Sequence, residues 1–249
     1  MKDIIKITSL SNAHIKELAK LDNAKSRDEL GKVLVEGKHL VKEAYALGIL
    51  CEVLFTSSDD YLESVDNYLV SEEIIKKLSH TTTPQGIIGV AKIKEKEIIY
   101  GDSLLLLDGV SDPGNLGTII RTAKAFGVSS IILSEGSIDI YNDKVIRATQ
   151  GQIFKMPIVK TNLKKVITEL KNKGYVVYAT SLKDAIDLEE VKEVNKYALV
   201  LGNEANGVSS EIIDLCDCSL KIKMEEDVES LNVAIAGAVC LYSLNNKRK

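Results

Sequence analysis

The sequence lacks the features that mark a secreted, membrane-embedded or metal-binding protein. No two of its four cysteines (Cys51, Cys216, Cys218, Cys240) form a C-x-x-C pair, so we expect reduced thiols in a cytoplasmic protein. The three histidines lie in the first third of the chain without the spacing of metal ligands, and no metal site is expected. No apolar run approaches the ~20 residues that cross a bilayer, and the N-terminus lacks the apolar core of a signal peptide. No membrane partner is expected.

Acidic residues slightly outnumber basic ones, 36 Asp and Glu against 32 Lys and Arg. The net charge of −4 argues against a protein that holds nucleic acid mainly by bulk charge. The basic residues are unevenly distributed, because they crowd the segment 16–42 and are absent from 51–75. This pattern leaves room for a local basic face, although a solvated helix surface is the simpler explanation.

Several nucleotide-binding and hydrolytic motifs are missing. No G-x-G-x-x-G follows a predicted strand, which removes the glycine fingerprint of dinucleotide-binding proteins and of common methyltransferases. The stretch 202–209 has the G-x-x-x-x-G frame of a phosphate loop, but Val208 stands where the phosphate-binding lysine belongs. A Ser-His-Asp triad is excluded from the second half because no histidine follows His80.

The stretch 104–126 is the most informative part of the chain. Four consecutive leucines, 104–107, predict a strand buried on both faces. A polar turn follows, and from Leu116 the apolar residues adopt the spacing of an amphipathic helix that Gly127 ends. Asn115 is a candidate cap of this helix. The unit is a strand, a loop and a helix, with polar residues at the carboxyl end of the strand, where open α/β sheets bind ligands.

The whole chain predicts an α/β protein of two domains. Strands alternate with helices, which favours a mostly parallel sheet. A charged segment near residue 95 is a plausible boundary. We expect a first domain over 1–94, a linker over 95–101 and a second domain over 102–249.

Three loops that follow predicted strands of the second domain each carry Gly, Asn, Glu or Ser residues. They are Asp108–Asn115, Gly202–Gly207 and Met224–Asn232. If the strands are parallel, these loops gather on one rim, where main-chain groups can hold an adenine-like ligand and Asn115, Glu204, Asn232 and Arg121 can orient a reacting group. Each residue also has an ordinary explanation, since Ser230 can cap the last helix, Asn232 can be a polar residue of its first turn, and the glycines can serve turns. Asn115 and Arg121 lie ~240° apart around one helix, so one of them is expected to face a neighbouring element or a second subunit.

Three stretches together resemble the motifs of the SpoU (TrmH-like) branch of the SPOUT RNA methyltransferases. They are Asp112-Pro113-Gly114-Asn115-Leu116-Gly117-Thr118-Ile119-Ile120-Arg121-Thr122-Ala123, Leu201-Gly202-Asn203-Glu204-Ala205-Asn206-Gly207-Val208, and Ile222-Lys223-Met224 with Ser230-Leu231-Asn232-Val233-Ala234. The first domain is similar to the ribosomal-protein-like α/β domain that binds the substrate RNA in this family, at Val35-Glu36-Gly37 and Gln85-Gly86-Ile87.

The resemblance implies a C-terminal α/β knot, tied as a trefoil, and a homodimer with its sites at the interface. It implies S-adenosylmethionine as methyl donor and a ribose 2′-hydroxyl of RNA as acceptor, with rRNA favoured over tRNA. The matching catalytic positions are Asn115, Arg121, Glu204, Ser230 and Asn232. The matching donor-binding positions are Gly202, Ile222 and Leu231, with Thr180 matched less closely. The family's arginine is thought to act on the other subunit's site, which agrees with the helical geometry of Arg121.

The third motif departs from the family pattern twice, with Lys223 in place of a usual proline and Ala234 in place of a frequent serine. Three alternatives stay open. They are an RNA-binding protein that keeps the fold without catalysis, an enzyme of the same fold that methylates an RNA base, and a small-molecule methyltransferase. The Ser-Leu-Asn sequence at 230–232 favours ribose chemistry over base chemistry, and the first domain argues for RNA over a small molecule.

Overall fold

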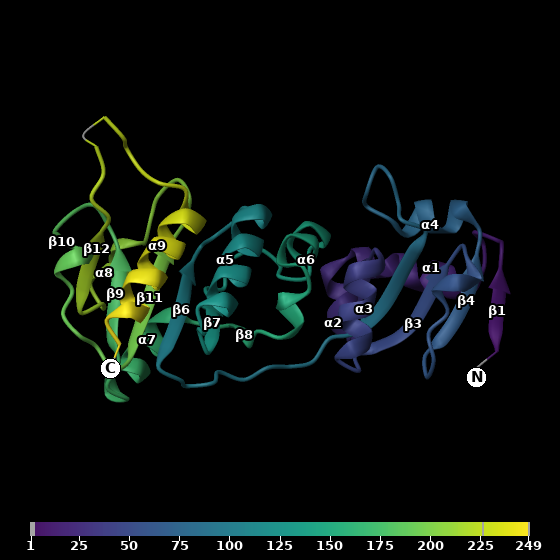
Figure 1. The fold of residues 1–249 in the computed structure, drawn as a ribbon, viewed down its shortest axis with the longest axis horizontal. Helices are drawn as coiled ribbons and strands as arrows, with labels where there is room; N and C mark the ends of the chain where they lie inside the picture. Colours follow the sequence, from purple (N-terminus) through teal and green to yellow (C-terminus); the bar gives the residue numbers. More distant parts are fainter. Residues whose placement is uncertain (1–2, 226, 249) are drawn as a thin grey trace. The chain divides into compact units, whose positions relative to one another are not determined.

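The chain divides into two compact units (Figure 1) in a computed structural model that describes residues 3–225 and 227–248. The first unit comprises the chain up to Glu95 together with Tyr141–Phe154, and the second comprises Lys96–Ile140 with the chain from Lys155 onward. The segment 141–154 thus lies inside the second domain by sequence but packs with the first unit. The boundaries 1–94 and 102–249 stay a prediction about which parts fold independently.

The first unit is built on a five-stranded mixed sheet of order β1-β4-β3-β5-β2. Its strands are β1 (Ile4–Ile7), β2 (Lys32–Glu36), β3 (Leu50–Phe55), β4 (Asp66–Val70) and β5 (Ile87–Lys92). Its helices are α1 (Ala13–Ala19), α2 (Ala24–Leu30), α3 (Lys38–Ala46), α4 (Glu72–Leu78) and α6 (Asp143–Thr149), with short 3-10 turns at Lys20–Asp22, Ser58–Asp60 and Gln152–Phe154. Strands β2 and β5 are antiparallel, so the end of β2 lies beside the start of β5. This end of the sheet carries the loop 79–86.

The second unit is built on a seven-stranded parallel sheet of order β10-β12-β9-β11-β6-β7-β8. Its strands are β6 (Ser103–Asp108), β7 (Ser130–Leu133), β8 (Ile158–Lys160), β9 (Val176–Thr180), β10 (Ala185–Asp187), β11 (Tyr197–Gly202) and β12 (Cys218–Lys221). Its helices are α5 (Pro113–Ala125), α7 (Leu163–Asn172), α8 (Ser210–Ile213) and α9 (Val233–Asn246), with a 3-10 turn at Leu188–Glu190. The predicted parallel α/β architecture of this half is confirmed.

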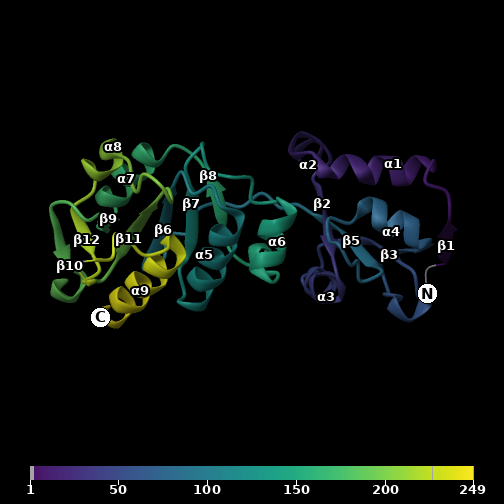
Figure 2. The same cartoon turned by 90° about the horizontal axis from the view of Figure 1, so that it is seen from above.

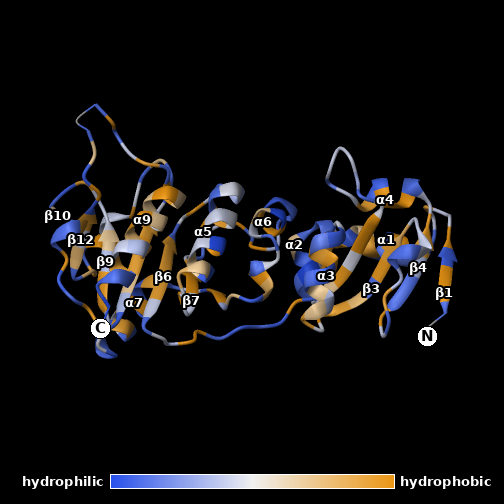
Figure 3. Cartoon of the chain, viewed as in Figure 1, coloured by the Kyte–Doolittle hydropathy of each residue, from blue (hydrophilic) through white to orange (hydrophobic). Residues whose placement is uncertain are grey.

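Helices cover both faces of the parallel sheet, which explains the run of leucines in its centre. Figure 2 shows α7 and α8 on one face and α5 and α9 on the other. All four leucines of β6 are fully buried, and Leu104 and Leu106 pack in one cluster with α7. The central strands β6 and β11 are accordingly hydrophobic between their two end residues (Figure 3).

Glycine lets α9 approach the sheet closely. A Cβ atom at Gly237 would lie 2.6 Å from Leu201 Cδ1 of β11, so a larger residue there would push the helix away. The small residues of the last helix therefore serve close packing, as its sequence indicates.

The caps of α5 and α9 differ from the simplest expectation. Asp112, not Asn115, caps α5, because Asp112 Oδ1 accepts a hydrogen bond of 2.7 Å from the Asn115 backbone N–H. Asn232, not Ser230, caps α9 through bonds from the N–H groups of Ala234 and Ile235. Both differences leave the amide groups of Asn115 and Asn232 at the start of their helices, beside each other. None of the helices in the described part of the chain is long and apolar enough to cross a bilayer.

Candidate active site

The candidate site lies at the carboxyl edge of the parallel sheet, within the second unit. Strands β6 and β11 are neighbours there, with Asp108 opposite Gly202 in register. The loop after β6 leads into α5, the loop after β11 contains Glu204, and the segment after β12 leads to the start of α9 (Figure 1). The three polar loops predicted to gather on one rim do so.

Glu204 holds the loop after β6 in place with both carboxylate oxygens. Glu204 Oε2 accepts from the Ser111 hydroxyl at 3.0 Å and from the Ser111 backbone N–H at 3.3 Å. Glu204 Oε1 accepts from the Asp112 backbone N–H and from Asn115 Nδ2, each at 3.1 Å. The carboxylate therefore fixes the loop and orients the Asn115 side chain at the same time.

These donors keep Glu204 ionised. Partial burial alone would raise the pKa of the Glu204 carboxyl, but the Asn115 amide and the backbone N–H groups of Asp112 and Ser111 outweigh it and hold the pKa at about 2. A carboxylate with this pKa and with donors on both oxygens is a poor proton acceptor near neutral pH. Its role is to orient its neighbours.

Asn115 links Glu204 to Asn232. Asn232 Nδ2 donates to Asn115 Oδ1 at 2.8 Å, while Asn232 Oδ1 caps α9. A carboxylate, two amides and a helix start thus form one chain of hydrogen bonds in which the orientation of each amide is fixed. Each amide nitrogen carries two hydrogens, and the chain uses one of them. One N–H of Asn115 and one of Asn232 therefore have no acceptor among the residues that the structure describes, and both are open to a ligand.

A further set of residues, which the sequence reasoning did not single out, fixes the loop that carries Glu204. Asn203 Nδ2 donates to the Gly109 carbonyl at 2.9 Å, and Asn203 Oδ1 accepts from the Ala205 N–H at 3.0 Å. Asp108 Oδ2 accepts from the Ser209 N–H at 2.9 Å. Asn203 and Asp112 lie inside the motif stretches and Ser111 directly precedes the first of them, so their position beside predicted site residues was the available signal.

Gly202 is required by the same loop. A Cβ atom on it would lie 2.0 Å from the Gly207 carbonyl carbon, and the Asn203 and Gly207 backbones pair with each other across this turn. Gly202 therefore has the turn role that the sequence predicts, because only a residue without a Cβ atom fits there.

Two predicted catalytic residues lie outside this hydrogen-bonded chain. Arg121 is exposed on α5 and makes no hydrogen bond or ion pair with any residue that the structure describes. Ser230 is exposed in the loop before α9 and likewise makes no hydrogen bond with any residue that the structure describes. The structure brings Asn115, Glu204 and Asn232 together within one chain, and their assignment as catalytic residues stays a prediction.

The predicted donor-binding residues lie along the same edge. Thr180 ends β9, Gly202 ends β11, Ile222 follows β12 and Leu231 precedes the cap of α9, and β12, β9 and β11 are adjacent strands. None of the four side chains is ionisable. These residues therefore fit a ligand that is recognised through main-chain N–H and C=O groups and apolar contact, as the adenosine of S-adenosylmethionine can be.

Two family models match the chain in succession. The model described as the SpoU rRNA Methylase family matches residues 102–242. The model described as the MRM3-like substrate binding domain matches residues 12–89. Together they cover both units.

Known proteins are similar over nearly the whole length. The 23S rRNA (guanosine(2553)-2′-O)-methyltransferase RlmP of Bacillus subtilis is 37% identical, over 96% of this chain and 98% of its own. The crystal structure of an AdoMet-bound rRNA methyltransferase from Sinorhizobium meliloti has a TM-score of 0.87 at 30% identity, covering 98% of each chain. An RNA 2′-O ribose methyltransferase structure has a TM-score of 0.83 at 28% identity, over 98% of this chain and 99% of its own. With its parallel sheet, its three motif loops and these matches, the chain belongs to the SpoU rRNA methylase family.

Proposed function

We propose that this protein transfers a methyl group from S-adenosylmethionine to a ribose 2′-hydroxyl of rRNA. The observation that carries the proposal is the hydrogen-bonded chain of Glu204, Asn115 and Asn232 at the edge where the predicted donor-binding loops meet. RNA is the appropriate acceptor class because its 2′-hydroxyl distinguishes it from DNA. S-adenosylmethionine would supply a methyl group from its positively charged sulfur and would leave as the neutral thioether. The protein's task is to aim the hydroxyl oxygen at the methyl carbon, while the hydroxyl proton passes to solvent at this exposed edge.

The two asparagines orient the acceptor ribose. Glu204 and the start of α9 fix both amides before the substrate arrives, so no reorganisation is needed when the hydroxyl binds. The free N–H groups of Asn115 and Asn232 donate to ribose oxygens and leave the 2′-oxygen lone pair directed at the methyl group. Ser230, two residues before Asn232, adds a hydroxyl from the same loop.

Arg121 stabilises developing charge and positions the RNA backbone. Its guanidinium offers five N–H donors in a planar fork that matches a phosphate, and it carries no acceptor that could take the hydroxyl proton in its usual form. Because Arg121 lies outside the bonded chain of its own subunit, we assign it to the site of a second subunit. Thr180, Gly202, Ile222 and Leu231 hold the methyl donor through the main chain, and no metal takes part.

The surface of α9 supports the homodimer. Ile235, Val239 and Tyr242 fall on one side of the helix, at positions i, i+4 and i+7, and are 51%, 39% and 60% exposed. An apolar stripe of this kind is unusual on the surface of a monomer. Its covering by a second copy, beside the neighbouring helix α5, agrees with a shared site. We further propose that the C-terminal part is tied in the trefoil knot of the family and that the protein acts in the cytoplasm.

The name of the Bacillus relative makes 23S rRNA the first substrate to test, and the guanosine named there the first nucleotide. The test incubates the protein and labelled donor separately with 23S rRNA lacking this modification and with total tRNA, and maps the label. Label confined to 23S rRNA supports the proposal. Label confined to tRNA would show that the substrate is tRNA and not rRNA. Donor binding without transfer to any RNA would favour a non-catalytic RNA-binding protein.

A further inference from the structure

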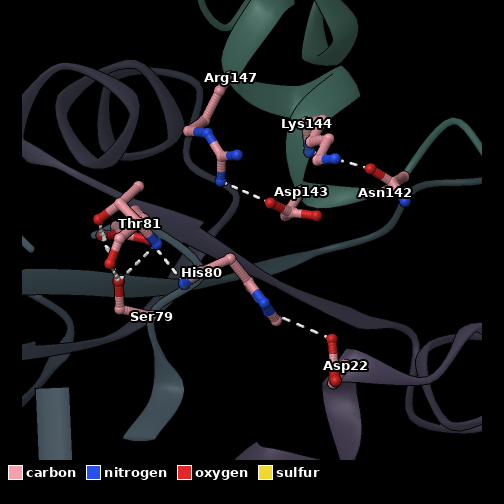
Figure 4. Close-up of polar contacts among 9 residues, drawn as sticks. Asp22, Ser79, His80, Thr81, Asn142, Asp143, Lys144 and Arg147 are labelled. Atoms are coloured by element: carbon pink, nitrogen blue, oxygen red, sulfur yellow. Dashed lines mark hydrogen bonds and ion pairs between the residues drawn. The ribbon is translucent and has the colours of Figure 1, made fainter. Parts of the chain in front are cut away.

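The first unit contains a second carboxylate with an organising role. Glu36, at the end of β2, accepts hydrogen bonds from the hydroxyls of Ser79 (2.7 Å) and Thr81, and its other oxygen accepts from the His80 backbone N–H at 3.3 Å. The Thr81 N–H in turn donates to Ser79 Oγ at 3.0 Å. Figure 4 shows this group, with the His80 ring directed away from it toward Asp22. Glu36 thus holds the first half of the loop 79–86.

The second half of the same loop is fastened separately. Gln85 Oε1 accepts from the Lys38 N–H at the start of α3 at 3.2 Å, and the Gly86 carbonyl accepts from the Thr56 N–H at 3.0 Å. Gly86 has φ +74°, and a Cβ atom on it would lie 2.7 Å from Thr56 Oγ1, so only glycine fits. Both ends of the loop are therefore fixed to neighbouring elements of the sheet edge.

The middle of the loop is exposed and has hydrogen-bonding groups to spare. Thr82 and Thr83 are exposed, and neither makes a side-chain hydrogen bond with any residue that the structure describes. Pro84 restricts the backbone beside them. The loop itself, 79–86, contains no carboxylate, and the oxygens of Glu36 are occupied by loop donors. The result is a rigid frame that presents two free hydroxyls, while the nearby carboxylates of Glu36 and Asp22 are each bonded to a group of the loop.

We propose that the loop 79–86 is a surface through which the first unit binds substrate RNA, and that Glu36 is the residue that positions it. The inference rests on the proposed function, since the ligand is the RNA that the second unit methylates. Hydroxyls on a preorganised loop donate to phosphate and ribose oxygens with little loss of conformational freedom on binding. This contact holds the RNA through its backbone and adds nothing to the methyl-transfer step.

The test compares three full-length variants on an unmodified 23S rRNA transcript. Thr82→Val/Thr83→Val removes the free hydroxyls, Glu36→Gln weakens the frame, and Thr8→Val is the control. Thr8 is an exposed threonine after β1, at the same end of the sheet but three strands away. We expect the Thr82/Thr83 variant to raise KM for RNA about tenfold, with kcat within about twofold and with unchanged Tm and donor affinity. Thr8→Val leaves all four quantities unchanged.

A double-mutant cycle separates positioning from a merely structural role. If Glu36 acts through the loop tip, Glu36→Gln raises KM alone but raises it no further in the Thr82/Thr83 background. An unchanged KM in the Thr82/Thr83 variant, an equal rise with Thr8→Val, or fully multiplicative effects would overturn the inference. Filter binding of the same transcript reports RNA affinity without catalysis, so that failure of the wild type to transfer methyl would count against the proposed function alone.

Discussion

At the residue scale, Glu204 behaves as an acceptor that orients other groups. Its two oxygens take four hydrogen bonds of 3.0–3.3 Å from Ser111, Asp112 and Asn115, and these bonds hold its pKa at about 2. A group used in this way contributes through its neighbours. Two predictions follow from its geometry and its charge.

Replacing Glu204 by glutamine is expected to lower kcat by about 100-fold. The side chain keeps its shape, but the new NH₂ group faces donors of the Ser111–Asn115 loop and the Asn115 amide loses its charged acceptor. Donor affinity, measured by calorimetry, should change by less than about threefold, because the donor is held by the main chain. A variant with near-normal kcat would show that Asn115 needs no partner.

The pH dependence of the wild type should contain no step from Glu204 between pH 5 and 9. The pKa of Glu204 is lower in the folded protein than its ordinary value of 4.5, so its contribution to loop stability is complete above pH 4.5 and is lost as the pH falls toward about 2. The measurement is kcat/KM against pH for wild type and Glu204→Gln. An acidic limb in the wild type that vanishes in Glu204→Gln would identify Glu204 as the base instead.

At the scale of elements, two helix caps of equal geometry differ only in their surroundings. Asn232 accepts from the N–H groups two and three residues ahead at 2.9 and 3.3 Å, and Asn12 does the same for α1 at 2.9 and 3.4 Å. Only Asn232 also donates to Asn115. A comparison of variants at Asn232 and Asn12 therefore distinguishes the effect of losing a helix cap from the effect of losing a site residue.

We expect Asn232→Ala and Asn12→Ala each to lower the free energy of unfolding by about 1 kcal/mol, as measured by urea denaturation. Only Asn232→Ala should reduce kcat. Asn232→Ser should restore the cap and the stability but not the activity, because serine lacks the amide that bonds Asn115. Equal activity of Asn232→Ser and wild type would show that the Asn115–Asn232 hydrogen bond is not needed for methyl transfer.

The elements were predicted well where their burial is uniform and less well at their ends. The four leucines of β6 and the apolar spacing of α5 already indicate which faces of these elements are buried, so the sequence predicts both. The caps at Asp112 and Asn232 were assigned to Asn115 and Ser230, because several capping residues lie within three positions and only the path of the chain selects one. The short edge strands β1 and β10 have too few residues for a pattern, and pairing with β4 and β12 creates them.

The site shows the same limit. The sequence placed Asn115, Glu204 and Asn232 on three loops, and the parallel order of the strands brings those loops together. It could not show that Asn203 and Ser111 complete the arrangement, since these contacts span more than ninety residues. It also could not show that segment 141–154 packs with the first unit.

At the scale of the whole molecule, the proposal of a second subunit rests on Arg121, which makes no hydrogen bond with Glu204, Asn115 or Asn232 of its own chain. The exposed stripe of α9 offers a surface for one. A shared site has a consequence that a monomer cannot reproduce. Two inactive subunits can then restore activity to each other.

We expect co-expressed Asn115→Ala and Arg121→Ala subunits to regain roughly a quarter of wild-type activity when they assort at random. Half of the dimers are then mixed, and each mixed dimer contains one site with both residues intact. Differently tagged subunits allow the mixed dimer to be purified and its size measured by light scattering. A mixed dimer as inactive as its parents would place Arg121 in its own subunit's site. A wild-type protein that is monomeric in solution would contradict the proposed homodimer.

The central claim is that the chain of Glu204, Asn115 and Asn232 aims a ribose hydroxyl at the methyl donor. Its most direct test is mass spectrometry of nucleosides from 23S rRNA that lacks this modification, after incubation with labelled donor and either wild type or Asn115→Ala. The account predicts a labelled 2′-O-methylnucleoside with wild type and none with Asn115→Ala, although both bind the donor. Label on a base, or equal 2′-O-methylation by the two proteins, would contradict it.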